Sequence, residues 1–399
     1  GLEDIQLKEG ETYTDLMGTR GDKNGELNDL VCSDGVDNDG DGKTDCADFG
    51  CRFNPAVSVC QDRSVMRFSI VANVEQSYDL ENEMHDTRFS KLQLRTFGTI
   101  PAIQDSFYLV SMRAEKVPRL TFAMFQVPVG GGHTMNLNSG GGGLSTAPTL
   151  SSAKYLMLEN AYYVTNAFQQ GNGAAVEFQG PLFTPPGMAD GALRYMAYAG
   201  GGSGRSSGNV GGRYFTYDNT NYTWSAGGRI DANLIGYINP RDTQFLLTPV
   251  STALAVRFGA KFDQRAQERF QAANSQISFR SGRVIFTGEH YFKNELNFGS
   301  IQQAYNVQLG YLVVNEKIMV AGDFGQFLAS EYDNPPEQEE TDIRKIRDET
   351  QWRAAIHYYF WRNIGVLTLL YKDRWLEAMY SDQPAEVERI IKLVGQYRF

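Results

Sequence analysis

Five carboxylates are crowded into the segment D37-N-D-G-D41-G-K-T-D45-C-A-D48. Counted from Asp37, they stand at positions 1, 3, 5, 9 and 12, position 6 is a glycine suited to a sharp turn, and position 7 offers a backbone carbonyl. Carboxylates this close repel one another unless a hard cation neutralises them, and calcium takes such oxygen ligands. The segment therefore predicts a Ca2+ site with the ligands Asp37, Asp39, Asp41, Lys43 (through its carbonyl), Asp45 and Asp48.

All four cysteines, Cys32, Cys46, Cys51 and Cys60, flank or enter this acidic segment. Four cysteines within 29 positions and none afterwards predict two disulfides formed in an oxidising compartment. Zinc is the alternative, but C-x-x-C pairs are missing and the surroundings are acidic. Residues 1–63 carry 15 acidic and 6 basic side chains, a net charge of −9, out of −10 for the whole chain. The predicted domains are therefore an acidic calcium-binding segment, residues 1–63, and a nearly neutral body, residues 64–399.

The run from Cys32 to Cys51 resembles the disulfide-bonded calcium repeats of the thrombospondin type 3 kind, and its acidic positions resemble an EF-hand loop. The resemblance implies structural calcium in a tight cap or linker. The resemblance also implies a pairing of Cys32 with Cys46 and of Cys51 with Cys60. The other two connectivities stay open from the sequence alone. A disordered acidic linker is the alternative interpretation.

The last twelve residues, E-R-I-I-K-L-V-G-Q-Y-R-F, alternate in character. From Ile391 to Phe399 every second residue is apolar or small, and most residues between are charged or polar, so a strand here has one apolar and one polar face. This pattern suits a strand that closes a barrel with lipid outside and water inside. The segment resembles the C-terminal signal by which outer-membrane barrels are assembled, with Tyr397 and Phe399 as its aromatic residues. The alternative, an edge strand of a soluble sandwich, would leave both rings on an open edge.

The same alternation recurs from Ser64 onward and is clearest from Leu254 to Phe262. No run of eighteen apolar residues could span a bilayer as a helix, whereas glycine (41), tyrosine (21) and phenylalanine (24) are abundant, as in transmembrane barrels. A large sandwich or propeller would show similar alternation without needing basic polar faces. At about twenty residues per strand and connection, residues 64–399 predict an all-β, transmembrane antiparallel β-barrel of about sixteen strands. We expect the small disulfide-bonded calcium-binding segment to precede it.

Two connections stand out as loops. Residues 129–153 are polar, glycine-rich and almost uncharged, and residues 330–350 are acidic before a short basic patch. The segments 120–130, 192–204, 286–292 and 395–399 resemble strand motifs of the phosphate-selective porin O/P family. The resemblance implies a sixteen-stranded trimeric porin of a bacterial outer membrane whose third loop narrows the pore. Only His133, with Lys154 just after, stands in the predicted constriction loop, so phosphate specificity is not predicted.

Basic side chains recur on the predicted polar faces, where they would line the lumen. A basic wall favours small anions, because it raises their local concentration and Arg can grip carboxylate or phosphate with two hydrogen bonds. The alternative is that these bases only pair with Asp231, Asp263, Glu177 and Glu289 across the lumen. The predicted pore-lining residues are Lys91, Arg95, Arg113, Arg119, Arg194, Arg229, Arg257, Lys261, Arg353, Lys392 and Arg398.

An enzyme is not predicted. Residues 204–208 match G-x-S-x-G without a strand-turn-helix context, and the four histidines lack H-x-x-x-H spacing. An acidic chain without a basic patch does not indicate nucleic-acid binding. Two functions remain: an outer-membrane porin for passive diffusion of small hydrophilic solutes, favouring anions, or a surface scaffold or adhesin anchored by the barrel. Expected partners are outer-membrane lipid and lipopolysaccharide, two further copies in a homotrimer, and a periplasmic or surface partner of residues 1–63. The chain is expected to be a mature form from which a signal peptide has been removed.

Overall fold

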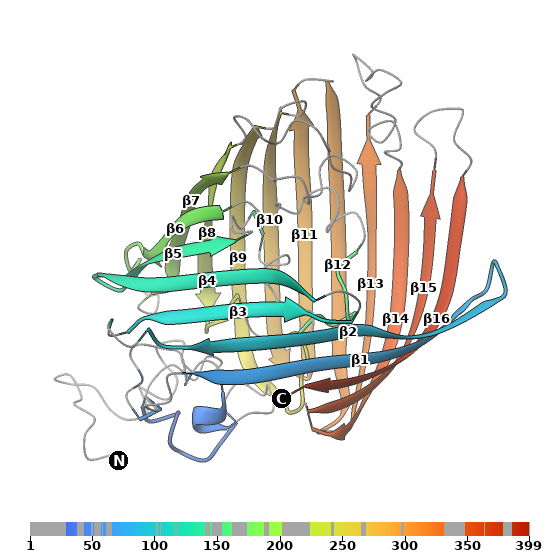
Figure 1. Ribbon diagram of the computed structural model, residues 1–399, viewed down its shortest axis with the longest axis horizontal. Helices are drawn as coiled ribbons and strands as arrows, with labels where there is room; N and C mark the ends of the chain where they lie inside the picture. The colour runs from blue at the N-terminus through green and yellow to red at the C-terminus, as the bar shows by residue number, and fades with distance from the viewer. Residues whose placement is uncertain are drawn as a thin grey trace.

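The chain forms one closed antiparallel β-barrel of sixteen strands in the computed structural model (Figure 1). The structure describes residues 29–37, 44–48, 51, 57, 59–60, 66–100, 103, 105–115, 118–139, 144–145, 154–161, 174–186, 191–201, 224–240, 243–264, 269–296, 299–330, 348–362, 364–377 and 385–398. The strands are β1 (Arg67–Asp79), β2 (Met84–Gly98), β3 (Phe107–Arg113), β4 (Arg119–Gly130), β5 (His133–Ser139), β6 (Ala174–Pro181), β7 (Leu193–Gly201), β8 (Trp224–Ile235), β9 (Val250–Gln264), β10 (Arg269–Gly282), β11 (Val284–Glu295), β12 (Ser300–Val314), β13 (Ile318–Ala329), β14 (Glu349–Trp361), β15 (Gly365–Leu376) and β16 (Glu386–Arg398).

Several predictions fall outside the described residues: Asp39, Asp41, Lys43, Phe399, the match at residues 204–208, most of the acidic loop 330–350 and the side chain of Arg119. Within the described part of the chain, no helix is both long and apolar enough to cross a lipid bilayer.

Each strand pairs with its sequence neighbours, and β1 closes the barrel by pairing with β16. The register places Val71 opposite Arg398 and Asp79 opposite Ile390. The closing strand β16 therefore lies beside the first strand of the barrel. Closure also satisfies both edges of the sheet, so the last strand does not leave an open edge.

Side chains alternate between an apolar outer face and a polar inner face, as the period of two requires. In β9, Phe258 points outward and is 55% exposed, whereas the adjacent Arg257 points inward and is 5% exposed. The same alternation in β12 places Tyr305, Leu309 and Val313 outside. The fold class predicted from the sequence, an all-β antiparallel barrel of about sixteen strands, is confirmed.

A β-bulge changes the phase of β4. The sequence pattern places Leu120, Phe122 and Met124 together on the apolar face, but Met124 is buried inside at 3% exposure and its neighbour Phe125 is exposed at 45%. The pairing of β3 with β4 shifts register between Ser111 and Met112. A shift of one residue moves every following side chain to the opposite face, which explains the difference.

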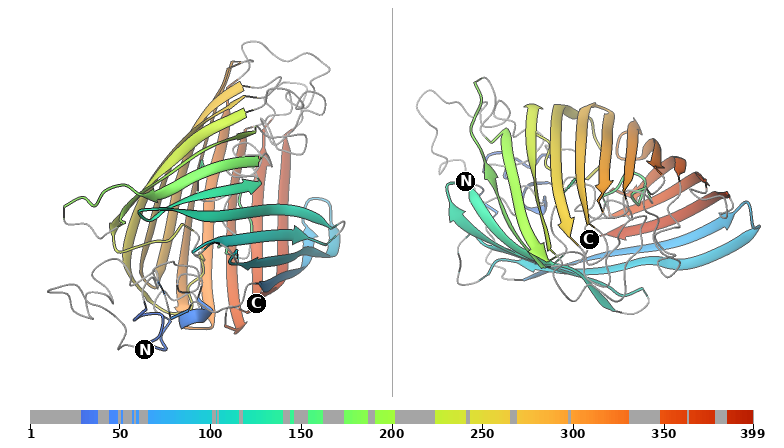
Figure 2. Two further views of the ribbon diagram at one scale, coloured as in Figure 1. Left: turned by 60° about the vertical axis from the view of Figure 1, so that its left-hand side comes forward. Right: turned by 90° about the horizontal axis from the view of Figure 1, so that it is seen from above.

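The two ends of the barrel carry different connections. The terminal end, where β1 begins and β16 ends, has tight turns at residues 131–132, 283, 315–317 and 362–364. The loop end, opposite to it, carries the longest connections, residues 140–173, 202–223 and 330–348. Figure 2 shows these two ends from other directions. One connection at the terminal end is an exception, because residues 236–249 between β8 and β9 turn back into the barrel.

The predicted constriction loop, residues 129–153, is wrong in its first part. Residues 133–139 form β5 and pair with β4, with Met135 and Leu137 outside and Asn136 and Asn138 inside. The turn is made by Gly130, Gly131 and Gly132, whose positive φ angles of 92°, 60° and 75° favour glycine. His133 follows directly, points outward and forms a 3.1 Å hydrogen bond with the Tyr195 hydroxyl. The connection that enters the lumen therefore begins only after Ser139.

Candidate pore lining and the segments inside the barrel

The predicted basic residues lie on the strand faces that point into the barrel, Arg119 excepted because its side chain is not described. Most of them have acidic or backbone partners. Arg229 donates to Asp231 at 2.6 Å, and Lys261 lies 3.7 Å from Asp263. The inward basic residues, by strand, are Lys91 and Arg95 (β2), Arg113 (β3), Arg194 (β7), Arg229 (β8), Arg257 and Lys261 (β9), Arg353 (β14), and Lys392 and Arg398 (β16).

Pairing within the lumen, the alternative to a free basic wall, is seen for Asp231 and Asp263. Asp231 binds Arg229 and lies 3.8 Å from Arg257, and Asp263 lies beside Lys261. Glu177 instead accepts a hydrogen bond from the Asn136 amide at 3.3 Å. Much of the basic wall is thus neutralised by neighbouring acids.

The described parts of the connection between β5 and β6, residues 144–145 and 154–161, lie inside the barrel. Its residues Leu144 and Ser145 lie against the inner wall, where the Ser145 hydroxyl is 3.0 Å from the Tyr291 hydroxyl. Gly259 on the inner face of β9 allows this approach, because a Cβ there would lie 2.0 Å from the carbonyl oxygen of Leu144. Further along, Leu156 and Met157 are fully buried. This infolded segment, residues 144–145 and 154–161 of the described chain, takes the place of the predicted constriction loop.

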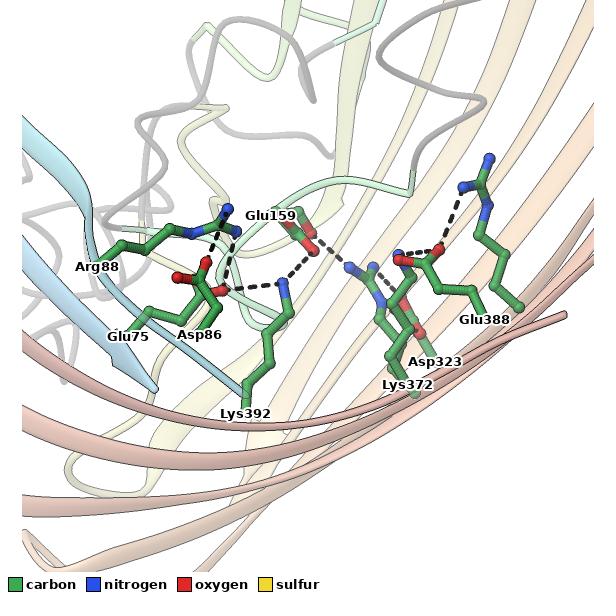
Figure 3. A network of polar contacts seen from close by, with 10 residues as sticks. Glu75, Asp86, Arg88, Glu159, Asp323, Lys372, Glu388 and Lys392 are labelled. Carbon is green, nitrogen blue, oxygen red and sulfur yellow. Dashed lines mark hydrogen bonds and ion pairs between the residues drawn. The ribbon is translucent and has the colours of Figure 1, made fainter. Parts of the chain in front are cut away.

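A charge clamp fixes the infolded segment to the wall of the barrel (Figure 3). The Glu159 carboxylate lies 3.5 Å from Lys392, and Lys392 also lies 3.5 Å from Glu75. The backbone carbonyl of Glu159 accepts a 3.0 Å hydrogen bond from Arg353, whose guanidinium also binds the Asp323 carboxylate. One short stretch of chain is therefore held from β1, β14 and β16 together.

The electrostatic setting of Glu159 keeps it ionised. Desolvation by the surrounding wall alone would raise its pKa, but the positive charges of Lys392 and Arg353 outweigh this effect and hold the pKa below the ordinary glutamate value. The side chain is nevertheless 52% exposed, so it faces water as well as its partners. Glu159 was not predicted from the sequence, because a lone acid in a polar connection carries no periodic signal.

A second segment enters the lumen from the terminal end, in the connection between β8 and β9. Its residues Phe245, Leu246 and Leu247 are buried. The backbone N–H of Gln244 donates to the carbonyl of Lys154 at 2.9 Å, and the Gln244 side-chain oxygen accepts from the Leu156 N–H at 2.7 Å. The two infolded segments thus meet inside the barrel. A run of three apolar residues between two strands was the signal that could have revealed this segment.

These segments share an apolar cluster with the inner wall at the terminal end. Side chains of six strands contribute to it, and all of its residues are buried. The cluster consists of Leu156 and Met157, Phe245, Leu246 and Leu247, and the wall residues Val250, Ile285, Leu312, Met319, Ala355, Tyr359, Val366 and Leu370. Arg398 of β16 lies beside it, with its guanidinium carbon 5.1 Å from the centre of the Phe245 ring. Most of the β9–β15 side of the terminal end is therefore filled by apolar side chains.

The β2–β3 side of the lumen is different. Gln93, Arg95 and Arg113 are only partly buried there, and they form a chain of polar contacts. The Gln93 amide donates to the Ser111 hydroxyl at 2.5 Å and accepts from Arg95 at 2.9 Å. Arg113 pairs with Glu115, which precedes β4. This wall keeps a partly exposed cationic group, Arg113, in the lumen.

The disulfide pairing expected from the calcium-repeat resemblance is wrong. Cys32 is bonded to Cys51 and Cys46 to Cys60, with Cα–Cα distances of 5.4 and 5.0 Å. The reason is a chain reversal that brings the beginning and end of the segment together, since the Val59 N–H donates to Asp29 at 3.0 Å. Valines 31 and 57 pack with the cysteines in a small core. All four sulfurs are in disulfides, which leaves no thiolate for the zinc alternative.

Of the predicted calcium ligands, Asp37, Asp45 and Asp48 lie in the described residues. The Asp45 carboxylate accepts a 3.0 Å hydrogen bond from the Gly35 N–H, and that of Asp48 accepts a 3.2 Å bond from the Cys51 N–H. Each bond uses one carboxylate oxygen, and a carboxylate has a second oxygen that can bind a cation. The Asp45 carboxylate thereby turns toward Gly35, just before the start of the predicted loop. Among the described residues, the aspartates of the loop are not gathered into a cation-sized group, so calcium binding stays a prediction.

Tyr397, one of the two predicted assembly residues, lies on the outer face of β16. Its ring centre is 6.1 Å from that of Trp361, close to the terminal end. Aromatic side chains at this position suit the interface between lipid and water.

Comparison with solved structures shows the same architecture in outer-membrane proteins. The outer-membrane channel DcaP of Acinetobacter baumannii has a TM-score of 0.55 at 10% identity, and the match covers 84% of this chain and 97% of that one. The trimer form of OmpT, an outer membrane protein of Vibrio cholerae, has a TM-score of 0.52 at 10% identity, covering 84% and 99%. The anion-selective porin from Comamonas acidovorans has a TM-score of 0.51 at 8% identity, also covering 84% and 99%. No protein-family model and no curated protein sequence matches the chain. The fold of this chain is that of a porin-like β-barrel.

Proposed function

We propose that the protein is a bacterial outer-membrane channel for passive diffusion of small hydrophilic solutes. The observation that carries this proposal is the two-faced wall: outward positions of the long strands are mainly apolar, and inward positions are mainly polar or charged outside the apolar cluster at the terminal end. A closed barrel of this kind satisfies its backbone hydrogen bonds in lipid and encloses a polar lumen. The test is ion conductance of the purified protein in planar bilayers. Absence of any conductance would contradict the proposal.

We further propose a preference for anions. It is supported by Arg95, Arg113 and Lys91 on one lumen wall, where Arg113 pairs with Glu115. A cationic lining lowers the barrier for anions. The reversal potential under a salt gradient measures this preference, and a cation-selective value would refute it.

Residues 1–63 are proposed as a calcium-stabilised segment at the terminal end, which faces the periplasm when the long connections face outward. The support is the ligand spacing from Asp37 to Asp48 and the Asp45 carboxylate turned toward Gly35. Chelation should loosen this segment and leave the heat-stable barrel intact. Protease cleavage with and without chelator measures this, and unfolding of the barrel by chelator alone would contradict it.

A homotrimer is proposed because one solved protein of this architecture is described as a trimer form. Mass photometry in detergent would detect it, and a monomer would overturn it.

A second candidate function is a surface scaffold in which the barrel is an anchor. The observation that favours it is the filling of the β9–β15 side by infolded segments. An anchor predicts no solute uptake into liposomes, whereas a channel predicts uptake.

A further inference from the structure

The β8–β9 connection behaves differently from the tight turns at its end of the barrel. It does not close β8 onto β9 directly but turns inward, so that Phe245, Leu246 and Leu247 lie inside with 1–2% exposure. An apolar triplet exposed to a water-filled pore would be unfavourable, because about 1.5–3 kcal/mol is gained by burying each such side chain. The three side chains are therefore buried against the inner wall instead of being left in contact with water.

Wall residues hold this segment from both sides. Arg257 donates to the carbonyl of Ile238 at 3.0 Å, and Arg280 donates to that of Thr243 at 2.8 Å. At the end of the triplet, the carbonyl of Leu247 accepts a 2.7 Å bond from the Glu316 N–H in the turn between β12 and β13. Two inward arginines thus anchor a backbone segment, which explains why they are buried.

The segment also docks on the other infolded connection. Gln244 makes a two-point clasp, with its N–H on the Lys154 carbonyl and its side-chain oxygen on the Leu156 N–H. Leu156 and Met157 then join the apolar cluster. Separation of the two segments would require only the loss of this clasp and of the apolar contacts between them.

Beyond the apolar cluster, toward the loop end, the inner wall on this side of the barrel is polar. It carries buried polar side-chain atoms without hydrogen-bond partners. Among the described residues, the Asn274 side-chain oxygen, one Glu289 oxygen and both polar side-chain atoms of Gln302 are buried and lack a hydrogen-bond partner. Buried polar groups without partners destabilise a structure, and water would satisfy them. These side chains suit a wet wall better than a dry one.

We propose that residues 243–247 are a resident plug, which closes the β9–β15 side of the lumen and restricts conduction to the other side. The inference rests on the proposed channel function and names the element that limits it. An apolar constriction excludes ions by losing its water, so the plugged side does not conduct. Removing or loosening the plug would open this side of the lumen to water.

The experiment compares single-channel conductance of the full-length protein with that of two variants. In the first, Gly-Gly replaces residues 243–247, and in the second, Gln244→Ala removes the side-chain half of the clasp. Gln303→Ala, on the outer face of β12, is the matched control. We expect roughly twofold or greater conductance for the replacement, more frequent large openings for Gln244→Ala, and no change for Gln303→Ala.

The outcomes separate the two proposals. A replacement variant that folds as a heat-stable barrel and conducts like the unaltered protein overturns the plug and leaves the channel function standing. No conductance from any form overturns both. If the replacement variant does not fold, Gln244→Ala decides, since unchanged gating there contradicts the plug.

Discussion

The two sides of the lumen are built by the same strand alternation but differ in their contact with water. On the β9–β15 side, Leu312 and Tyr359 point inward and are fully buried under the infolded segments. On the β2–β3 side, the Arg113 side chain keeps 30% of its surface exposed. An inward position in a barrel is therefore not sufficient to make a residue pore-lining. The segments that enter the lumen decide which wall faces the solute.

The ion pairs show the same contrast and give the largest expected effect. Asp323 and Arg353 are each 1% exposed in their pair, whereas Asp86 and Arg88 are 55% exposed in theirs. Asp323→Ala removes the carboxylate that neutralises a buried guanidinium, so the free energy of unfolding should fall by about 3–5 kcal/mol. Asp86→Ala should cost about 1 kcal/mol or less. Urea unfolding in lipid vesicles measures both, and equal losses would remove the distinction between the two sides.

A deletion in the apolar cluster should have the next largest effect. Leu312→Ala, at an inward and fully buried position of β12, should lower the free energy of unfolding by about 3 kcal/mol through lost contacts and the cavity left behind. Leu309→Ala lies on the outer face of the same strand and serves as the control. The same unfolding assay applies. A cost for Leu312→Ala no greater than for its control would mean that the cluster is loosely packed.

The smallest effect is expected at the charge clamp. Glu159→Gln removes an ion pair with Lys392 that is half exposed, so its contribution is on the order of 1 kcal/mol or less. Because the pKa of Glu159 is lowered, the clamp is fully present above the ordinary glutamate pKa and is lost as pH falls through the lower value in the folded protein. Current noise from the infolded segment should therefore rise as pH falls below the ordinary glutamate pKa. Glu159→Gln should show this noise already at neutral pH, and a quiet variant would contradict the clamp.

The barrel could be predicted because its signal is local. Inward and outward positions follow from alternation within a strand, as from Leu254 to Phe262, and the closing strand carries its own pattern. The bulge that moves Met124 inward and the crossing of the disulfides depend on register and chain reversal, which alternation does not encode.

Much of the candidate site depends on contacts between distant parts of the chain. The pairing of Arg353 with the Glu159 carbonyl joins residues 194 positions apart, and the Leu156–Gln244 contact joins residues 88 apart. No spacing in the sequence indicates such pairs. The basic residues were recognisable, but their partners and the segment covering them were not.

The most direct test of this account places one cysteine on each side of the lumen. Gln93 in β2 and Gln308 in β12 both point inward, and all native cysteines are in disulfides. A water-soluble thiol reagent added during bilayer recording should reduce the current of Gln93→Cys quickly and leave that of Gln308→Cys unchanged. Equal block of both variants, or block of Gln308→Cys alone, would contradict a channel whose open path follows β2 and β3.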